Sequence, residues 1–463
     1  MLTLLLIVPL AAVLFCNLPF SFLRRSIIPL AVLLAVLQAL VAVFLPEATA
    51  MSFVLPLFAD GFSRVMLLAI AIVSASALLV GRVTFADERT RCNFASLVLL
   101  AVLGMNGVAL CADLFSIYVF VEVAAVSSFV LIASEKSRAG LEGAFKYFVL
   151  SAAASIAMLS AVALFFLVSG STGFAAVALA LRALPGQPLV LLALALFIGG
   201  LFIKSGLMPF HGWVPDAYAS APSAVSVLLA GIVTKTTGVY VLMRVMADVC
   251  WLDRAGDVIM LAGAFTLAAA AFAAMAQSDM RRMLAYSSIS QVGYIILSFG
   301  IGTPLGMAGA IFHLFNHSVF KSLLFVNAAA VEKQTGLRDM NAMGGLAQKM
   351  PLTGAASVIG LLSTAGVPPL AGFWSKLVII LALWQAGHYV YAVIAVLASL
   401  VTLTYFLIMQ RKIFFGLLRP GFEKVTEAFG MAAPVILLAA LTVAIGLAIP
   451  FIKGTFLLPL TGM

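Results

Sequence analysis

The chain has 463 residues, of which 64% are hydrophobic and only 9% are charged, and its formal net charge is +9. Ordinary soluble domains carry roughly 25% charged residues, so this composition excludes a soluble enzyme, a disordered tail and a secreted disulfide scaffold. Apolar runs of about 20 residues, the length that crosses a bilayer as a helix, recur along the whole chain. A β-barrel needs alternating strands of about ten residues, whereas these runs are continuous. The sequence therefore predicts an all-α polytopic membrane protein embedded in a lipid bilayer.

Polar breaks between the apolar runs predict about 14 membrane-spanning helices within a single membrane domain, 1–463. The predicted spans are 1–20, 26–45, 63–81, 94–112, 114–133, 143–168, 188–219, 222–246, 257–276, 286–301, 305–331, 351–387, 389–416 and 431–452. The first three predicted spans form an N-terminal part, 1–93, and the last span begins a C-terminal part, 431–463. No basic segment precedes the first run, so we interpret it as a retained helix and not as a cleaved signal.

Basic residues in the loops orient these spans. Loops that follow odd-numbered spans hold 17 Lys and Arg residues, and five lie on the opposite side. Those five are Arg64, Arg182, Arg244, Arg254 and Lys453. Basic residues concentrate in cytoplasmic loops, so we expect both termini on the outer (periplasmic) side of the inner membrane. The charges are scattered over many short loops and do not predict a nucleic-acid partner.

Four lysines fall inside apolar runs: Lys204, Lys235, Lys321 and Lys376. A lysine facing lipid at the bilayer centre costs roughly 2.5–3.5 kcal/mol on insertion scales, so these side chains must face protein, a partner or water. Glu122 is the acidic residue that falls in the middle of a predicted span. A structural Glu–Lys ion pair is one interpretation. Five ionisable residues on five different helices favour an ion path.

His313, His317 and Lys321 recur every four residues along one predicted helix, which rises about 12 Å over that stretch. As a metal site the two histidines lack a companion acid or thiolate nearby, and as a haem site they share one helix. A buried histidine is often a satisfied core residue, but two of them leading to a buried lysine favour a proton relay.

Four cysteines lie far apart in the sequence and form no C-x-x-C pair: Cys16, Cys92, Cys111 and Cys250. They cannot by themselves build an iron–sulfur cluster, a zinc ribbon or a c-type haem site. We therefore expect neither a metal site nor a cofactor site in this chain.

The seventh and twelfth predicted spans are too long for one straight crossing, and Pro and Gly interrupt both. The interruptions are 204–216, which begins at Lys204, and 366–376, which ends at Lys376. Proline frees backbone carbonyls, and free carbonyls at membrane depth are tolerated only where they line protein or water. A structural kink explains either break alone. Broken helices in corresponding places predict two inverted five-helix repeats, helices 4–8 (94–246) and 9–13 (257–416).

Four ordered motifs carry a family resemblance. They read FIKSGLMPFHGWVPDAYASAPSAVSVLLAGIVTKTTGVY (202–240), MRRMLAYSSISQVGY (280–294), HLFNHSVFKSLLF (313–325) and GVPPLAGFWSK (366–376). The chain resembles the antiporter-like proton-pumping membrane subunits shared by respiratory complex I (NADH:quinone oxidoreductase), membrane-bound hydrogenases and Mrp-type cation/proton antiporters. The resemblance covers nearly the whole chain.

The resemblance implies a 14-helix core with a charged chain across the middle of the membrane. It implies that Glu122 and Lys204 form the glutamate–lysine pair of the first half-channel, and that Lys235 bridges the two halves. It further implies that His313, His317 and Lys321 act as a relay and that Lys376 is the terminal residue. Family members use Lys or Glu at that last place.

The expected function is translocation of protons, or of sodium, by one subunit of a large redox-driven membrane complex. The chain shows no redox site of its own, so any electron transfer belongs to partner membrane subunits, and whether the chain counts as an enzyme stays open. It lacks the long lateral helix of the largest complex I member, which favours a middle subunit or its hydrogenase or Mrp equivalent. The alternatives are a subunit of an Mrp-type sodium/proton antiporter without electron transfer, and a membrane scaffold whose buried charges only specify packing.

Overall fold

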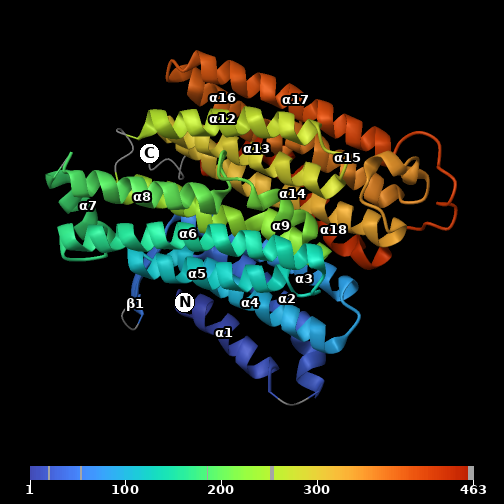
Figure 1. Ribbon diagram of the computed structural model, residues 1–463, viewed down its shortest axis with the longest axis horizontal. Coiled ribbons are helices and arrows are strands. Elements are labelled where there is room, and N and C mark those ends of the chain that lie inside the picture. The colour runs from blue at the N-terminus through green and yellow to red at the C-terminus, as the bar shows by residue number, and fades with distance from the viewer. Residues whose placement is uncertain (19–20, 53–54, 185, 251–254, 457–463) are drawn as a thin grey trace. The chain divides into compact units, whose positions relative to one another are not determined.

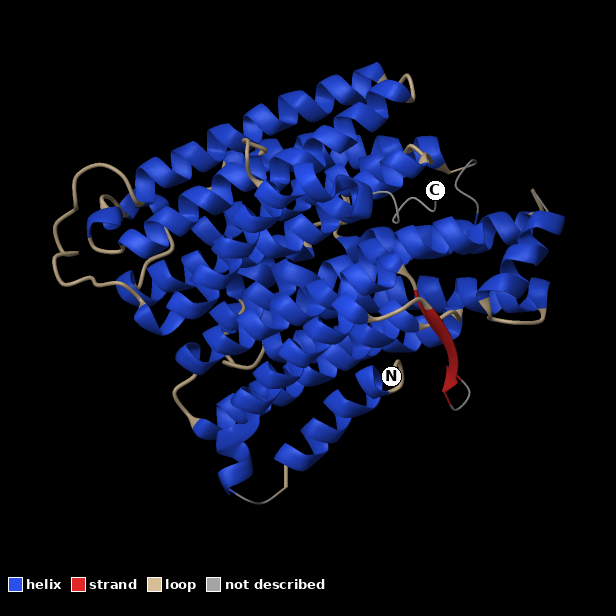
Figure 2. Cartoon of the chain, turned by 180° about the vertical axis from the view of Figure 1, so that it is seen from behind, coloured by secondary structure: helices blue, strands red, loops and turns tan. Residues whose placement is uncertain are grey.

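The computed structural model describes residues 1–18, 21–52, 55–184, 186–250 and 255–456, and helices dominate all of them (Figure 2). Twelve of the helices in these ranges are long and apolar enough to cross a membrane. The chain is thus an all-α multi-pass membrane protein, which confirms the predicted fold class.

The elements follow the chain from an N-terminal helix to a C-terminal one. They are α1 (Leu4–Cys16), α2 (Ser21–Phe44), β1 (Ala48–Ser52), β2 (Leu55–Ala59), α3 (Gly61–Thr84), α4 (Glu88–Leu110), α5 (Leu114–Ile132), α6 (Arg138–Ser169), α7 (Phe174–Ala183), α8 (Pro188–Ser205), α9 (Trp213–Ser220), α10 (Ser223–Leu228), η1 (Leu229–Val233), η2 (Lys235–Tyr240), α11 (Val241–Val245), η3 (Met246–Cys250), α12 (Gly256–Met275), α13 (Met280–Gly300), α14 (Pro304–Thr335), η5 (Met340–Ala342), η6 (Leu346–Gln348), α15 (Pro351–Ala365), α16 (Ala371–Gln385), α17 (Tyr389–Ile413), η7 (Phe429–Met431) and α18 (Ala432–Phe456).

These elements form two compact units. Unit 1 comprises 1–78, 85–213 and 232–255, and unit 2 comprises 79–84, 214–231 and 256–463. Unit 1 contains Glu122, Lys204 and Lys235, whereas unit 2 contains both relay histidines, Lys321 and Lys376.

Two of the expected spans are not among the twelve long apolar helices. The first is the 13-residue α1, and the second is the broken twelfth span, whose halves α15 and α16 have 15 residues each. The seventh span is also broken, into α8 and the short α9. Both predicted interruptions are therefore present.

The two breaks use the same helix-ending turn. Gly206 (φ 67°) ends α8 and Gly366 (φ 86°) ends α15, each in the left-handed region that glycine enters without a Cβ penalty. The next amide of each, Leu207 N and Val367 N, donates back to the carbonyl oxygens of Phe202 (3.1 Å) and Leu362 (2.9 Å). This is the Schellman pattern of a terminated helix, and a proline follows each glycine by three residues.

Some elements were not expected from the sequence. An antiparallel hairpin pairs β1 with β2, with Ala48 opposite Ala59, and the ten-residue α7 follows α6. One helix boundary also differs from the prediction: α13 begins at Met280, whereas the predicted span begins at 286, so Arg281 and Arg282 lie in the first turn of the helix.

The eighth span, Ser223–Cys250, is wound unevenly. Most of it is buried, and it contains three π-helical stretches, η1, η2 and η3. π-Helical turns are rare and occur often at functional sites. Lys235 opens the second of them.

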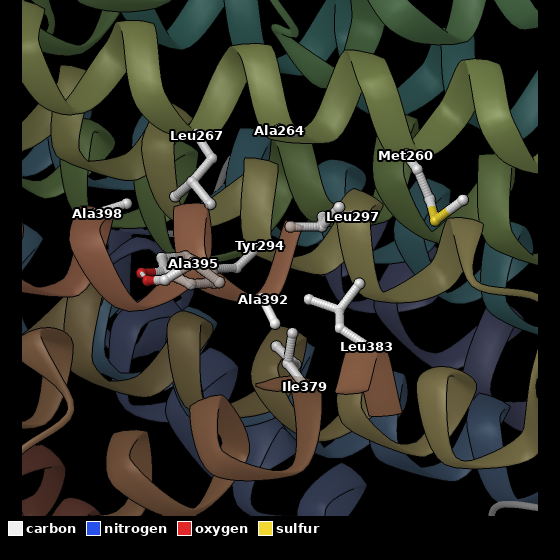
Figure 3. Packing of buried hydrophobic residues seen from close by; sticks show 10 residues of the cluster. All are labelled: Met260, Ala264, Leu267, Tyr294, Leu297, Ile379, Leu383, Ala392, Ala395 and Ala398. Atoms are coloured by element: carbon white, nitrogen blue, oxygen red, sulfur yellow. Dashed lines mark hydrogen bonds between the residues drawn. The ribbon is translucent and has the colours of Figure 1, made fainter. Parts of the chain in front are cut away.

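Within unit 2, buried apolar residues of four helices pack together (Figure 3). α12 contributes Met260 and Leu267, α16 contributes Ile379, and α17 contributes Ala395. The ring of Tyr294, from α13, lies against Ala395 in this cluster. A buried tyrosine needs a partner for its hydroxyl, and here that partner is the Ala395 carbonyl.

Candidate ion-translocation site

The Glu122–Lys204 pair is formed in unit 1. The Lys204 Nζ lies 2.9 Å from Glu122 Oε1 and 2.7 Å from the hydroxyl of Ser151. The Lys204 side chain is 1% exposed and that of Glu122 is 30% exposed. One member of the pair is thus enclosed by protein, and the other remains accessible at the surface of the unit.

Three helices position this pair. α5 carries Glu122, α8 carries Lys204, and α6 supplies the two serines near them; in Figure 1 these helices run alongside one another. Ser155 lies one turn beyond Ser151 on α6 and donates to Glu122 Oε1 at 2.5 Å. Lys204 occupies the last turn of α8, where the helix dipole and the exposed carbonyls favour a cation. The break after Gly206 therefore creates a site suited to an ammonium group.

Lys235 is fully buried in unit 1, on the π-helical stretch η2. η2 packs on the end of α8, because Gly238 has no side chain. A Cβ at Gly238 would lie 2.5 Å from the backbone nitrogen of Ser205. This close approach brings the element that carries Lys235 against the helix end that carries Lys204.

The relay residues of unit 2 lie along α14, fully buried. The rings of His313 and His317 are stacked, with centroids 6.3 Å apart and planes inclined by 12°. His313 Nδ1 lies 2.9 Å from the hydroxyl of Ser375 on α16. The four-residue spacing seen in the sequence therefore does produce one polar stripe on this helix.

Lys321 continues the stripe toward α13 and α17. Its Nζ donates to Ser287 Oγ at 2.6 Å and lies 3.5 Å from the Leu284 carbonyl oxygen. The ammonium also lies 5.3 Å from the centre of the Phe406 ring. The hydroxyl of Tyr405 donates to the same serine oxygen at 2.8 Å.

Lys376, on α16, is also buried. Its Nζ lies over the ring of Tyr294, 4.4 Å from the centroid, which is within the range of a cation–π contact. It donates to Ser399 Oγ at 3.3 Å and to the Ala365 carbonyl oxygen, at the end of α15, at 3.4 Å. The Tyr294 ring also contacts the His313 ring, with centroids 5.6 Å apart. Tyr294 therefore touches both the relay and the terminal lysine.

No group of three His, Cys, Asp or Glu side chains able to hold a metal occurs among the described residues. The four cysteines are buried free thiols. The polar atoms of the site are amines, imidazoles, hydroxyls and a carboxylate, which donate or accept hydrogen bonds and can exchange protons.

A second charged cluster in unit 1 was missed by the sequence reasoning, which assigned Arg244 only to an outer loop. The Arg244 guanidinium donates two bonds of 2.7 Å to the Asp60 carboxylate and a third, of 3.2 Å, to Asp248. It also lies 4.8 Å from the centre of the Phe58 ring and 5.0 Å from that of the Phe62 ring. Burial raises the pKa of Asp60, but the hydrogen bonds and charge of Arg244 outweigh that effect and lower this pKa to about 2.

The sequence reasoning also missed the hydroxyl partners of the buried lysines. Ser151 and Ser155 lie one turn apart in an apolar helix, and that spacing is a signal that could have identified them. Ser287 and Tyr294 lie inside a motif that already carried the resemblance. Ser399 has no comparable signal, because it is a single serine in an apolar run.

The sequence matches a known family of membrane subunits. Residues 111–402 match the family described as NADH:quinone oxidoreductase/Mrp antiporter, TM. The chain belongs to this family. The resemblance drawn from the four motifs is thereby confirmed.

Individual family members agree with this assignment. The chain is 37% identical to NADH-quinone oxidoreductase subunit N of Desulforudis audaxviator, over 76% of this chain and 70% of that protein. It is 32% identical to one subunit of the Na(+)/H(+) antiporter of Alkalihalophilus pseudofirmus, over 85% of this chain and 80% of that protein. A chain of the Mrp complex from Dietzia sp. DQ12-45-1b superposes with a TM-score of 0.90 at 27% identity, covering 100% of this chain and 96% of that one. Family members of this kind are subunits of multi-subunit membrane complexes, and this antiporter-like chain is expected to have membrane partners of the same kind.

Proposed function

We propose that this antiporter-like subunit translocates protons, or sodium, through its buried ionisable residues. Glu122, Lys204 and Lys235 act in unit 1. His313, His317, Lys321 and Lys376 act in unit 2. The observation that carries the proposal is the 2.9 Å pair of Glu122 with a fully enclosed Lys204 at the broken end of α8.

The pair supports ion transport because its two members differ in accessibility. An ammonium that loses its carboxylate partner in an apolar interior holds its proton less tightly. Separating Glu122 from Lys204 therefore favours release of a proton from Lys204, and rejoining them favours uptake. The neighbouring hydroxyls of Ser151 and Ser155 remain as partners for the separated groups.

Lys204→Ala tests the proposal in the purified complex, reconstituted in vesicles. Transport should fall to background while the complex still assembles. Lys146→Ala is the matched control, because Lys146 also pairs with a glutamate (Glu142, 2.7 Å) but its side chain is 43% exposed. Wild-type transport by the Lys204 variant would refute the role of the pair.

The parent complex is proposed to be a redox-driven one, resembling complex I or a membrane-bound hydrogenase. The relative named as subunit N of an NADH-quinone oxidoreductase supports this assignment. The alternative, an Mrp-type sodium/proton antiporter without electron transfer, is supported by the TM-score of 0.90 with a chain of an Mrp complex. Purification of the native complex decides between them: reduction of an acceptor coupled to ion uptake supports the first, and sodium/proton exchange without a reductant supports the second.

The proposed location is the inner membrane with both termini on the outer side. The support is the distribution of Lys and Arg over the loops, although Arg254 falls outside the described residues. A reporter that is active only in the cytoplasm, fused at the C-terminus, should therefore stay silent. An active reporter would show that the chain crosses the membrane an odd number of times or enters from the other side.

A further inference from the structure

Lys321 and Lys376 of unit 2 have the same kind of surroundings, although they lie on different helices. Each ammonium donates to a serine hydroxyl, and each of those serine hydroxyls lies within hydrogen-bond distance of a tyrosine hydroxyl. Each ammonium also faces an aromatic ring, Phe406 for Lys321 and Tyr294 for Lys376. Two buried lysines in one unit thus share a lysine–serine–tyrosine arrangement.

The same two helices build both arrangements with their roles exchanged. For Lys321, on α14, the serine is Ser287 of α13 and the tyrosine is Tyr405 of α17. For Lys376, on α16, the serine is Ser399 of α17 and the tyrosine is Tyr294 of α13. The Ser399–Tyr294 oxygens are 2.6 Å apart, and the Ser287–Tyr405 oxygens are 2.8 Å apart.

Acidic residues are scarce around these lysines. The helices α13 to α17 contain a single acidic residue, Glu332, which forms ion pairs with Arg281 and Arg338 near the end of α14. The other charged residues of α13 and α17, Arg282, Arg411 and Lys412, lie in the terminal turns of those helices. The titratable groups beside the arrangements are His317, one turn before Lys321, and His313, whose ring contacts Tyr294.

A hydroxyl differs from a carboxylate in one decisive respect. An ionised carboxylate only accepts hydrogen bonds, whereas a hydroxyl donates one and accepts others, and its hydrogen rotates freely. A charged lysine donates to the serine oxygen. A neutral lysine accepts the serine hydrogen, and the tyrosine hydroxyl then donates to the serine oxygen. Both states are satisfied by rotation of two hydroxyl hydrogens, without movement of the heavier atoms.

We propose that Ser287 with Tyr405, and Ser399 with Tyr294, are positioning residues of the ion path that let Lys321 and Lys376 alternate between charged and neutral forms. This inference rests on the proposed function and specifies that the mobile charge in unit 2 is a proton held by a lysine. The Ala395 carbonyl completes the second arrangement, because it accepts from Tyr294 at 2.5 Å and from Ser399 at 3.2 Å.

Four variants test the proposal: Ser287→Ala, Tyr405→Phe, Ser399→Ala and Tyr294→Phe. Each removes one oxygen and adds no larger group. The matched control is Ser298→Ala, because Ser298 is also buried on α13 but donates to the carbonyl oxygen of Gly306, near the start of α14, at 2.7 Å. The measurements are the amount of assembled complex, the transport rate per complex in vesicles, and the dependence of that rate on pH.

All four variants should assemble normally. The two serine variants should transport about tenfold more slowly, because each loses a hydrogen bond to a charged lysine. The two tyrosine variants should be slowed less, because their hydroxyls act on the lysine through the serine. The two serine variants should also shift the midpoint of the transport–pH curve by about one pH unit toward acid, because the charged lysine loses a stronger bond than the neutral one. A purely structural role would leave this midpoint unchanged.

Normal rates and an unchanged pH curve in all four variants would overturn the inference. Lys321→Met, measured in the same vesicles, separates this failure from failure of the proposed function. If Lys321→Met is inactive while the four hydroxyl variants are normal, the ion path stands and the hydroxyl role is wrong. If Lys321→Met itself transports normally, the proposed function of Lys321 is wrong.

Discussion

Lys204 in unit 1 and Lys376 in unit 2 both lie beside a helix break, yet their partners have opposite character. Lys204 pairs with a carboxylate at 2.9 Å, whereas Lys376 contacts a tyrosine ring, a serine hydroxyl and a backbone carbonyl. A carboxylate stabilises only the charged form of a lysine. A hydroxyl can form a hydrogen bond with either form, because it accepts from the charged amine and donates to the neutral one.

The difference suggests a division of labour between the units. In unit 1, Lys204 and Arg244 are held by ion pairs, and the Arg244 guanidinium binds Asp60 and Asp248. An ion pair changes state when its members separate, so it can respond to a movement. Unit 2 holds its lysines by groups that tolerate a change of protonation without moving.

Replacing Lys376 should have the largest effect on transport. Lys376→Met removes the titratable group while retaining much of the side-chain volume, and transport should fall to background. Lys376→Glu should retain part of it, since the Ser399 hydroxyl can donate to a carboxylate. Vesicle assays of both variants, normalised to assembled complex, check this ranking.

The opposite ranking at Lys376 would support a structural role for the cation, because an acid placed there would lose the contacts of the ammonium with the Tyr294 ring and the Ala365 carbonyl oxygen. A Met variant that pumps normally would show that Lys376 is not part of the ion path. The comparison of Lys376 with Lys204 as two sites of ion transport would then no longer hold.

Replacing the carboxylate partner in unit 1 should have a smaller effect. Glu122→Gln keeps the size of the side chain and its hydrogen bond to Lys204 but removes the charge. Transport should fall about tenfold, in line with the loss of a charge-assisted bond of roughly 1.5–3 kcal/mol. The control is Glu142→Gln on α6, whose partner Lys146 is exposed; a similar loss in this control would show that the effect is not specific to the buried pair.

The Arg244 cluster should affect stability and leave the transport rate nearly unchanged. Because the folded-state pKa of Asp60, about 2, lies below its ordinary value of 3.8, its ionised form stabilises the fold above that ordinary value. This contribution should decline as the pH falls from about 4 to 2. Asp60→Asn should lower stability by about 1 kcal/mol or less at neutral pH, since the Asp60 side chain is 37% exposed.

Thermal unfolding of the solubilised protein between pH 2 and pH 7 checks this prediction. The acid-dependent loss of stability should be smaller in Asp60→Asn than in the wild type. Identical pH dependence in the two proteins would show that Asp60 does not contribute to acid sensitivity.

Much of the fold and the charged part of the site could be predicted from the sequence. Apolar runs of bilayer length are a strong signal for membrane-spanning helices. An interruption by Pro and Gly predicts a break in such a helix, as at Gly206 and Gly366. Buried charges are equally visible, because Lys204 and Lys376 stand out in an apolar background. The resemblance then implied the pairing of Glu122 with Lys204, which the structure places at 2.9 Å.

The missed features have weaker local signals. Ser399 and Tyr405 look like ordinary residues of an apolar helix, and only packing reveals that they reach a lysine. The π-helical winding of η2 has no marker residue in the sequence, and the close approach of Gly238 to Ser205 becomes visible only in the packed structure. The hairpin of β1 and β2 is apolar and short, so its sequence cannot be distinguished from a loop between two spans.

A charge exchange at the Glu122–Lys204 pair tests the central claim most directly. The double variant Glu122→Lys with Lys204→Glu keeps two opposite charges beside Ser151 and Ser155 but places the cation on α5 and the carboxylate at the enclosed end of α8. If the pair moves ions, the double variant should assemble and yet transport at background level, because the enclosed group is no longer a lysine. Transport restored to the wild-type rate by the exchange would show that the pair only holds the helices together, and would contradict the account.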